Sequence, residues 1–184
     1  MSAVSPEILA RIEEAYQGEV FGLAMYAAIA QAQTDPVRHW KWQVLTQLEA
    51  ETKAHMAGLL QRLCGDTLEQ EQSRQDGLKE ARAIIGLPWP EMIEAFMADL
   101  PGLIDDYADL ERQAALAGED AAVLSRLTRH EVVTLEFCKR ELAGDGATAL
   151  APRAGNAGFA ATRPGLTPSP RFKIPEAGTP RPNR

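Results

Sequence analysis

The stretch LTQLEAET at residues 45–52 decides the fold, because the chain repeats it in nearly the same form as LTRHEVVT at residues 127–134. Both copies follow the pattern L-T-x-x-E-x-x-T. The leucine, the glutamate and the second threonine stand at positions i, i+4 and i+7, which share one face of an α-helix. That face is otherwise apolar, so Glu49 and Glu131 occupy positions where core side chains belong. The repeat predicts two matching helices, each with a carboxylate on its buried face.

Start and stop signals around the first copy predict a helical hairpin. Residues 5–7, Ser-Pro-Glu, combine a capping hydroxyl, a proline at the first helical position and an acid near the positive end of the helix dipole. The pair Asp35-Pro36 repeats this signal, and Gly65 ends the second helix. The apolar stripe of the first helix contains Glu19. Because the link between the two helices is short, they are expected to be antiparallel neighbours.

A second hairpin follows a polar crossover at residues 66–85, which is expected to be exposed and either helical or irregular. The third helix is expected to kink at Pro101-Gly102. The fourth begins at Glu119-Asp120, contains the second copy of the repeat and ends at Gly144. These signals predict an all-α domain of two helical hairpins joined by one long connection.

Composition limits the number of domains and the partners. The chain has 184 residues, 45% of them hydrophobic, which predicts one domain over residues 1–149. The net charge of −7 argues against nucleic acid as a partner, since phosphate binding needs a basic surface. No apolar run predicts a signal peptide or a membrane span, so we expect no membrane partner and a cytoplasmic location.

Residues 150–184 differ in character from the rest of the chain. They contain seven of the twelve prolines, and six Lys and Arg residues against Glu176 as the only acid. Such a Pro/Gly-rich basic segment does not bury enough surface to fold alone. Two interpretations stay open: a solubilising tail, or a segment that docks to a protein partner or to the acidic body.

The order of helices and the repeated motif resemble the ferritin-like superfamily, the group that holds ferritin, rubrerythrin and the di-iron hydroxylases, over roughly residues 5–144. The resemblance implies a ferritin-like four-helix bundle that forms a homodimer. In that family the first and third helices each supply one glutamate, the second and fourth each supply an E-x-x-H motif, and together they hold two irons.

Three positions match the family's ligands and others depart from them. Glu19, Glu49 and Glu131 stand at glutamate positions of the first, second and fourth helices. Thr52 and Thr134 stand where the two histidines of the E-x-x-H motifs belong, and a hydroxyl is a poor iron ligand.

Other residues offer substitutes for the missing ligands. The third helix has only an aspartate at this level, Asp106 or its neighbour Asp105. His55 and His130 lie near the two glutamates of the repeat and could complete a rearranged site with one metal or a shifted pair. The expected metal is iron or manganese, because carboxylates and imidazole suit these ions.

Two functions from different classes follow. One is an oxidoreductase that activates O₂ or peroxide, or oxidises Fe(II), at a metal in the bundle core. The other is a metal-free bundle that serves as a binding or scaffold protein, whose buried acids are hydrogen-bonded to tyrosines or threonines or paired with an arginine. The sequence offers no phosphate-binding loop, nucleophile elbow or H-E-x-x-H motif that would point to another class.

Overall fold

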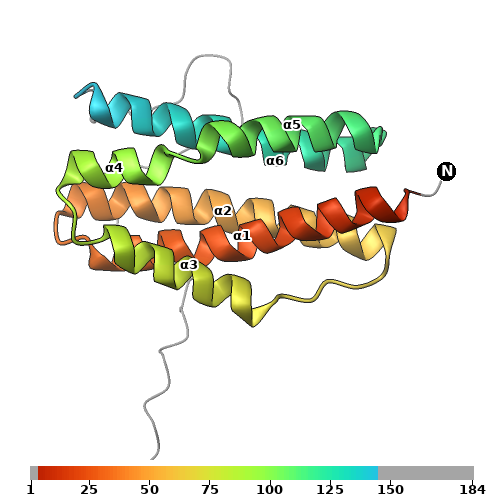
Figure 1. Cartoon of the computed structure of the whole chain (residues 1–184), viewed down its shortest axis with the longest axis horizontal. Helices are drawn as coiled ribbons and strands as arrows, with labels where there is room; N and C mark the ends of the chain where they lie inside the picture. The colour runs from red at the N-terminus through yellow and green to blue at the C-terminus, as the bar shows by residue number, and fades with distance from the viewer. Residues whose placement is uncertain (1–3, 145–184) are drawn as a thin grey trace, which may run out of the picture.

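The structure is a computed structural model, and it describes residues 4–144. Within this range it consists of α-helices and contains no strand, which confirms the all-α prediction (Figure 1). The helices are α1 (Pro6–Ala32), α2 (Pro36–Leu63), α3 (Glu71–Ile84), α4 (Trp89–Met97), α5 (Leu100–Ala114) and α6 (Gly118–Leu142). The proposed boundary at residue 149 and the tail after it lie outside the described residues.

Helices α1 and α2 form the first hairpin, and both begin where the capping signals predict. The Ser5 hydroxyl accepts a hydrogen bond from the backbone N–H of Ile8. The Asp35 carboxylate accepts bonds from the N–H groups of Val37 and Arg38. These bonds satisfy donors that have no partner inside the helix. The two helices pack side by side along their length.

The second hairpin is built from α4, α5 and α6, because the predicted third helix is broken in two. The break falls at Ala98 and Asp99, before the expected kink at Pro101-Gly102. Pro101 has no N–H to bond the carbonyl of Met97, so the hydrogen-bond ladder stops at that carbonyl. Proline then occupies the first turn of α5, a position that tolerates it.

The crossover contains α3, which packs closely on α1. A Cβ built on Gly77 of α3 would lie 2.2 Å from the carbonyl oxygen of Phe21 in α1, so the two backbones approach each other directly. Ala81 and Ile84 of the same helix are buried. The crossover is therefore helical and partly packed, whereas its polar sequence predicted mainly exposure.

The two hairpins face each other, with α2 against α6 and α1 against α5. Their apolar side chains form two clusters toward opposite ends of the bundle. One cluster surrounds Trp42 and includes Met25, Tyr26, Phe96 and Phe137. The other includes Ile12, Met56, Leu59, Tyr107 and Leu124. On α2 and α6, buried polar residues stand between the segments that supply the two clusters, and on α1 Glu19 lies near the end of the second cluster's segment.

None of the helices in the described part of the chain is both long and apolar enough to cross a membrane.

Candidate functional site

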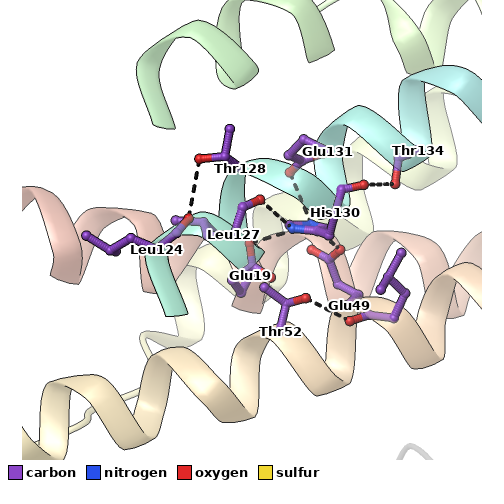
Figure 2. A network of polar contacts seen from close by, with 10 residues as sticks. Glu19, Glu49, Thr52, Leu124, Leu127, Thr128, His130, Glu131 and Thr134 are labelled. Atoms are coloured by element: carbon purple, nitrogen blue, oxygen red, sulfur yellow. Dashed lines mark hydrogen bonds and ion pairs between the residues drawn. The ribbon is translucent and has the colours of Figure 1, made fainter. Parts of the chain in front are cut away.

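A layer of buried polar side chains from α1, α2 and α6 meets in the interior of the bundle (Figure 2). Helix α1 contributes Glu19, α2 contributes Glu49, and α6 contributes both His130 and Glu131; each is at most 3% exposed. Ionisable groups are rarely buried to this extent unless they are paired or bind a metal. Four such groups in one place therefore mark the layer as the candidate site.

The imidazole of His130 lies at the centre of this cluster. Its Nε2 atom is 3.1 Å from Oε2 of Glu49, 3.3 Å from Oε1 of Glu131 and 3.8 Å from Oε1 of Glu19. Three carboxylates from three helices thus converge on a single nitrogen. Single ligand atoms from Glu19, His130 and Glu131 all lie within 4.8 Å of one another, close enough for a shared metal ion.

The other ring nitrogen fixes the orientation of the imidazole. Nδ1 of His130 lies 2.8 Å from the carbonyl oxygen of Leu127, and a carbonyl only accepts hydrogen bonds, so Nδ1 carries a proton and donates it. Nε2 then faces the carboxylates either with a second proton or with its lone pair. A histidine that donates one N–H to a backbone carbonyl and offers its other nitrogen to a site is the usual arrangement of a metal ligand.

Two carboxylate oxygens in the cluster have no hydrogen-bond partner within residues 4–144. They are Oε2 of Glu19 and Oε2 of Glu131. Leaving an acceptor buried and unpaired costs about 1–3 kcal/mol, and more for a charged group. The residues of the cluster therefore satisfy one another only in part.

The buried setting shifts the ionisation of the cluster. Burial, reinforced by the charge of Glu49, raises the pKa of Glu19 well above its ordinary value, although His130 opposes this. Burial raises the pKa of Glu131 to about 7, against the lowering effect of His130. Burial alone would lower the pKa of His130, but the carboxylates, Glu19 foremost, raise it well above the ordinary value. Burial and the charge of Glu49 therefore raise the pKa of both acids, and attraction to the surrounding carboxylates raises the pKa of the histidine.

Helix α1 leaves room for the carboxylate that comes from α2. A Cβ built on Gly22 would lie 1.9 Å from Oε1 of Glu49, which no real structure tolerates. The missing side chain thus provides the space into which Glu49 extends. Gly18, one turn earlier, leaves room in the same way for the Tyr107 hydroxyl, which would lie 2.8 Å from its Cβ.

The structure brings together four of the six predicted site residues: Glu19, Glu49, His130 and Glu131. The expectation that Glu19 and Glu49 meet at one level agrees with their common approach to His130.

The structure places the other two predicted site residues, His55 and Asp106, away from this cluster, because both side chains are exposed. His55 lies six residues beyond Glu49, which turns it about 240° around α2, away from the bundle interior. Asp106 directly precedes Tyr107, and that tyrosine takes the inward position on α5, where its hydroxyl approaches α1. Asp105 is exposed as well.

Both threonines of the repeat are buried next to the cluster and bonded within their own helices. The Thr52 hydroxyl donates to the carbonyl of Leu48, and the Thr134 hydroxyl donates to the carbonyl of His130, each at 3.0 Å. Their short side chains take up the space one turn beyond each glutamate without adding a nitrogen ligand.

Two contributors to the site had not been identified from the sequence. Gly22 contributes by leaving space for the Glu49 side chain, and Leu127 contributes its backbone carbonyl, which accepts the hydrogen bond from His130. Neither residue has a side chain that binds metals. The sequence does contain one indication of this space. Gly18 and Gly22 lie one turn apart on either side of Glu19, and glycine inside a helix is unfavourable unless a close contact requires it.

Comparison with protein-family models, curated proteins and solved structures found no match for this chain. Conclusions about function therefore rest on the geometry of the buried cluster.

Proposed function

We propose that this protein is a ferritin-like metalloprotein that binds iron or manganese in its bundle core and acts in oxidoreductase chemistry with O₂ or peroxide. The ligands would be the carboxylates of Glu19, Glu49 and Glu131 and the Nε2 atom of His130. Hard carboxylate oxygens with one imidazole nitrogen suit both ions, whereas a thiolate-rich set would favour softer ones.

The main support is the surroundings of His130. Its Nδ1 proton is committed to the Leu127 carbonyl, and its Nε2 atom faces three buried carboxylates within 3.8 Å. One oxygen each of Glu19 and Glu131 in the same place has no hydrogen-bond partner in the described part of the chain. A cation at the centre would satisfy all of these atoms together, because it accepts the nitrogen lone pair and neutralises the acids.

The arrangement of the helices agrees with the proposed family. The α1/α2 hairpin packs on the hairpin formed by α4, α5 and α6, and a long connection joins the two. The candidate ligands come from three of these helices and point inward, as in carboxylate-bridged bundles. The homodimer implied by the family resemblance stays a prediction, which analytical ultracentrifugation would test.

The residues around the cluster would support redox chemistry in a distinct way. A bound iron or manganese supplies electron transfer to or from a small oxidant. The two apolar clusters exclude bulk water on either side, and the Leu127 carbonyl holds the imidazole in one tautomer. The carboxylates offset the positive charge of the ion.

Elemental analysis of the full chain purified without chelator tests this function, followed by Fe(II) addition in air with O₂ consumption recorded. We expect stoichiometric iron or manganese and Fe(II)-dependent O₂ uptake. Glu19→Ala should abolish both, whereas Glu14→Ala, a change at an exposed position on the same helix, should preserve them. A Glu19→Ala protein with unchanged metal content and melting temperature would refute the proposal.

The alternative is a metal-free bundle that serves as a binding or scaffold protein. The observation in its favour is that His130 pairs directly with Glu49 at 3.1 Å, so a protonated imidazole can replace a metal as the central cation. In that case Mn²⁺ and Fe²⁺ leave the melting temperature unchanged. Glu131→Gln then stabilises the protein above about pH 7 with or without added metal, because it removes a buried, ionised acid that lacks a full set of partners.

A further inference from the structure

We propose that the cluster binds a single ion per chain, with Nε2 of His130 and carboxylate oxygens of Glu19, Glu49 and Glu131 as its ligands, and has no second metal position. This inference rests on the proposed metal-binding function and departs from the two-iron centre that the family resemblance implies. Three features of the described residues support it.

The first feature is the number of donors. A dinuclear centre in a four-helix bundle uses four carboxylates and two histidines. Here three carboxylates and one imidazole are buried together. The position on α5 that faces this level holds Tyr107, and the aspartates beside it are exposed. The fourth carboxylate and the second nitrogen are therefore missing from the cluster.

The second feature is the direction in which the available donors point. Each carboxylate has one oxygen within 3.8 Å of the same atom, Nε2 of His130. In a site with bonds of about 2.0–2.2 Å, ligands on opposite sides of one ion lie about 4.2 Å apart. One ligand atom each of Glu19, His130 and Glu131 lie within 4.8 Å of one another, so these three donors can surround one point.

The third feature is that side chains without metal-binding groups fill the positions where a second ion would bind. Thr52 and Thr134 stand one turn beyond the two glutamates of the repeat, and each hydroxyl proton is bonded to the carbonyl four residues earlier. Next to these threonines begin the apolar clusters, with Met56 on α2 and Cys138 on α6. A second cation would meet neutral hydroxyls and hydrocarbon, which do not repay the loss of its water shell.

The charge of the cluster agrees with a single ion. Three carboxylates with a neutral imidazole bring a charge of −3. One divalent ion reduces this to −1, and one trivalent ion cancels it, whereas two divalent ions leave a buried positive charge. Uncompensated charge in an apolar interior is costly. With divalent ions the residual charge is one unit for either number of ions, but one trivalent ion gives a neutral site and two would leave a charge of +3, so the charge favours one ion in the trivalent case.

Titration of the chelator-treated full chain with Mn²⁺ measures the stoichiometry directly, by isothermal calorimetry and by low-temperature electron paramagnetic resonance. We expect one Mn²⁺ per chain and the six-line spectrum of an isolated ion. Two ions per chain, or the spectrum of a spin-coupled pair, would overturn the single-ion proposal and leave metal binding in place. No bound Mn²⁺, together with no bound Fe²⁺ in a parallel anaerobic titration, would overturn both.

Variants test the assignment of the ligands. Glu131→Gln preserves the size of the side chain and should weaken Mn²⁺ binding roughly tenfold or more. His130→Leu should abolish binding, whereas His55→Leu, a change of the exposed histidine on α2, should preserve one ion per chain. If His130→Leu does not fold, the Mn²⁺ affinity of Glu131→Gln alone tests the assignment of the ligands. One ion per chain with unchanged affinity in Glu131→Gln would contradict the assignment.

Discussion

The two copies of the L-T-x-x-E-x-x-T repeat share their backbone setting and differ in one buried side chain. In α2 and in α6 the leucine is buried, the glutamate points into the bundle, and the final threonine donates its hydroxyl to the carbonyl four residues earlier. The residue before the glutamate is the half-buried Leu48 in α2 and the buried His130 in α6. One copy therefore supplies an acid alone, and the other supplies an acid with a nitrogen.

This difference shows that a helical repeat sets positions, while single residues set chemistry. A symmetric pair of E-x-x-H motifs would place one nitrogen on each side of the bundle. Among the described residues 4–144, the only buried imidazole comes from α6, and it lies one residue before the glutamate instead of three after it. The result is a one-sided cluster in which Glu49, Glu19 and Glu131 all depend on His130 for a partner.

The largest loss of stability is expected for His130→Leu, which gives the α6 copy the leucine that the α2 copy has at Leu48. Removing one partner of a buried ionic cluster costs about 3–5 kcal/mol, because the remaining charges stay buried without compensation. Urea denaturation of the metal-free protein at pH 8 would measure this loss in the free energy of unfolding. At pH 5 the loss should shrink, since the carboxylates take up protons.

His55→Leu is the matched control, because it makes the same His-to-Leu substitution at an exposed position. It should change the free energy of unfolding by no more than about 0.5 kcal/mol. Equal stability of the two histidine variants at pH 8 would contradict a central role for His130.

The next prediction concerns the acid of the α6 copy and the pH. The pKa of Glu131 is raised to about 7 in the folded protein from an ordinary value of 4.5, so folding favours its protonated form. That contribution is fully present below about pH 4.5 and is lost as the pH rises through 7, on the order of 3 kcal/mol for this group.

The raised pKa of His130 acts in the same direction, because protonation of the folded state stabilises it up to a higher pH. The metal-free protein should therefore lose stability between pH 5 and 8 in denaturation experiments. Glu131→Gln should flatten this profile and Glu14→Gln should not. Bound Mn²⁺ should reverse the trend, since metal competes with protons for the ligands. A rise in metal-free stability over this range would contradict the account.

A third change disturbs the acid of the α2 copy through its neighbour. Gly22→Ala introduces a Cβ at 1.9 Å from the Glu49 carboxylate and should cost about 1–3 kcal/mol by overpacking. Thermal unfolding would measure the loss. Shortening the acid as well, in Gly22→Ala/Glu49→Asp, should recover much of it.

Gly58→Ala provides the control, because the nearest atom to its added Cβ is the flexible end of Arg62 at 3.4 Å. This substitution should stabilise the helix by about 0.5–1 kcal/mol. If Gly22→Ala stabilised the protein equally, Glu49 would not occupy the space beside α1.

The smallest effect is expected where the two copies are most alike. Thr52→Val and Thr134→Val keep the shape and remove a hydroxyl that bonds only within its own helix. Each should cost less than about 1 kcal/mol and leave the number of bound Mn²⁺ ions unchanged. Loss of Mn²⁺ binding in either variant would identify that threonine as a ligand.

Much of the fold followed from local signals in the sequence. Capping by Ser5 and Asp35 depends only on residues next to them in the chain, and α1 and α2 begin directly after these two caps, as predicted. The position of the break before α5 was missed, since proline acts on the carbonyl four residues earlier. The packing of α3 was also missed, because the contact of Gly77 with Phe21 joins distant parts of the chain and leaves no periodic pattern.

The candidate site was predictable where its residues lie on an apolar stripe. Glu19, Glu49 and Glu131 lie there, and the structure brings them together. His55 and Asp106 fit by residue type and by position along the chain, but their helices turn them outward. His130 is a quarter-turn from Glu131, and whether such a side chain points inward depends on where neighbouring helices pack, which spacing alone does not determine.

The central claim is that an ion lies among Glu19, Glu49, Glu131 and His130. The most direct test is anomalous X-ray diffraction at the manganese or iron edge from crystals of the metal-loaded full chain. We predict one anomalous peak per chain, about 2.0–2.2 Å from Nε2 of His130 and from oxygens of the three glutamates. A cluster without a peak, in which Nε2 donates directly to Glu49 as a protonated imidazole, would contradict the claim.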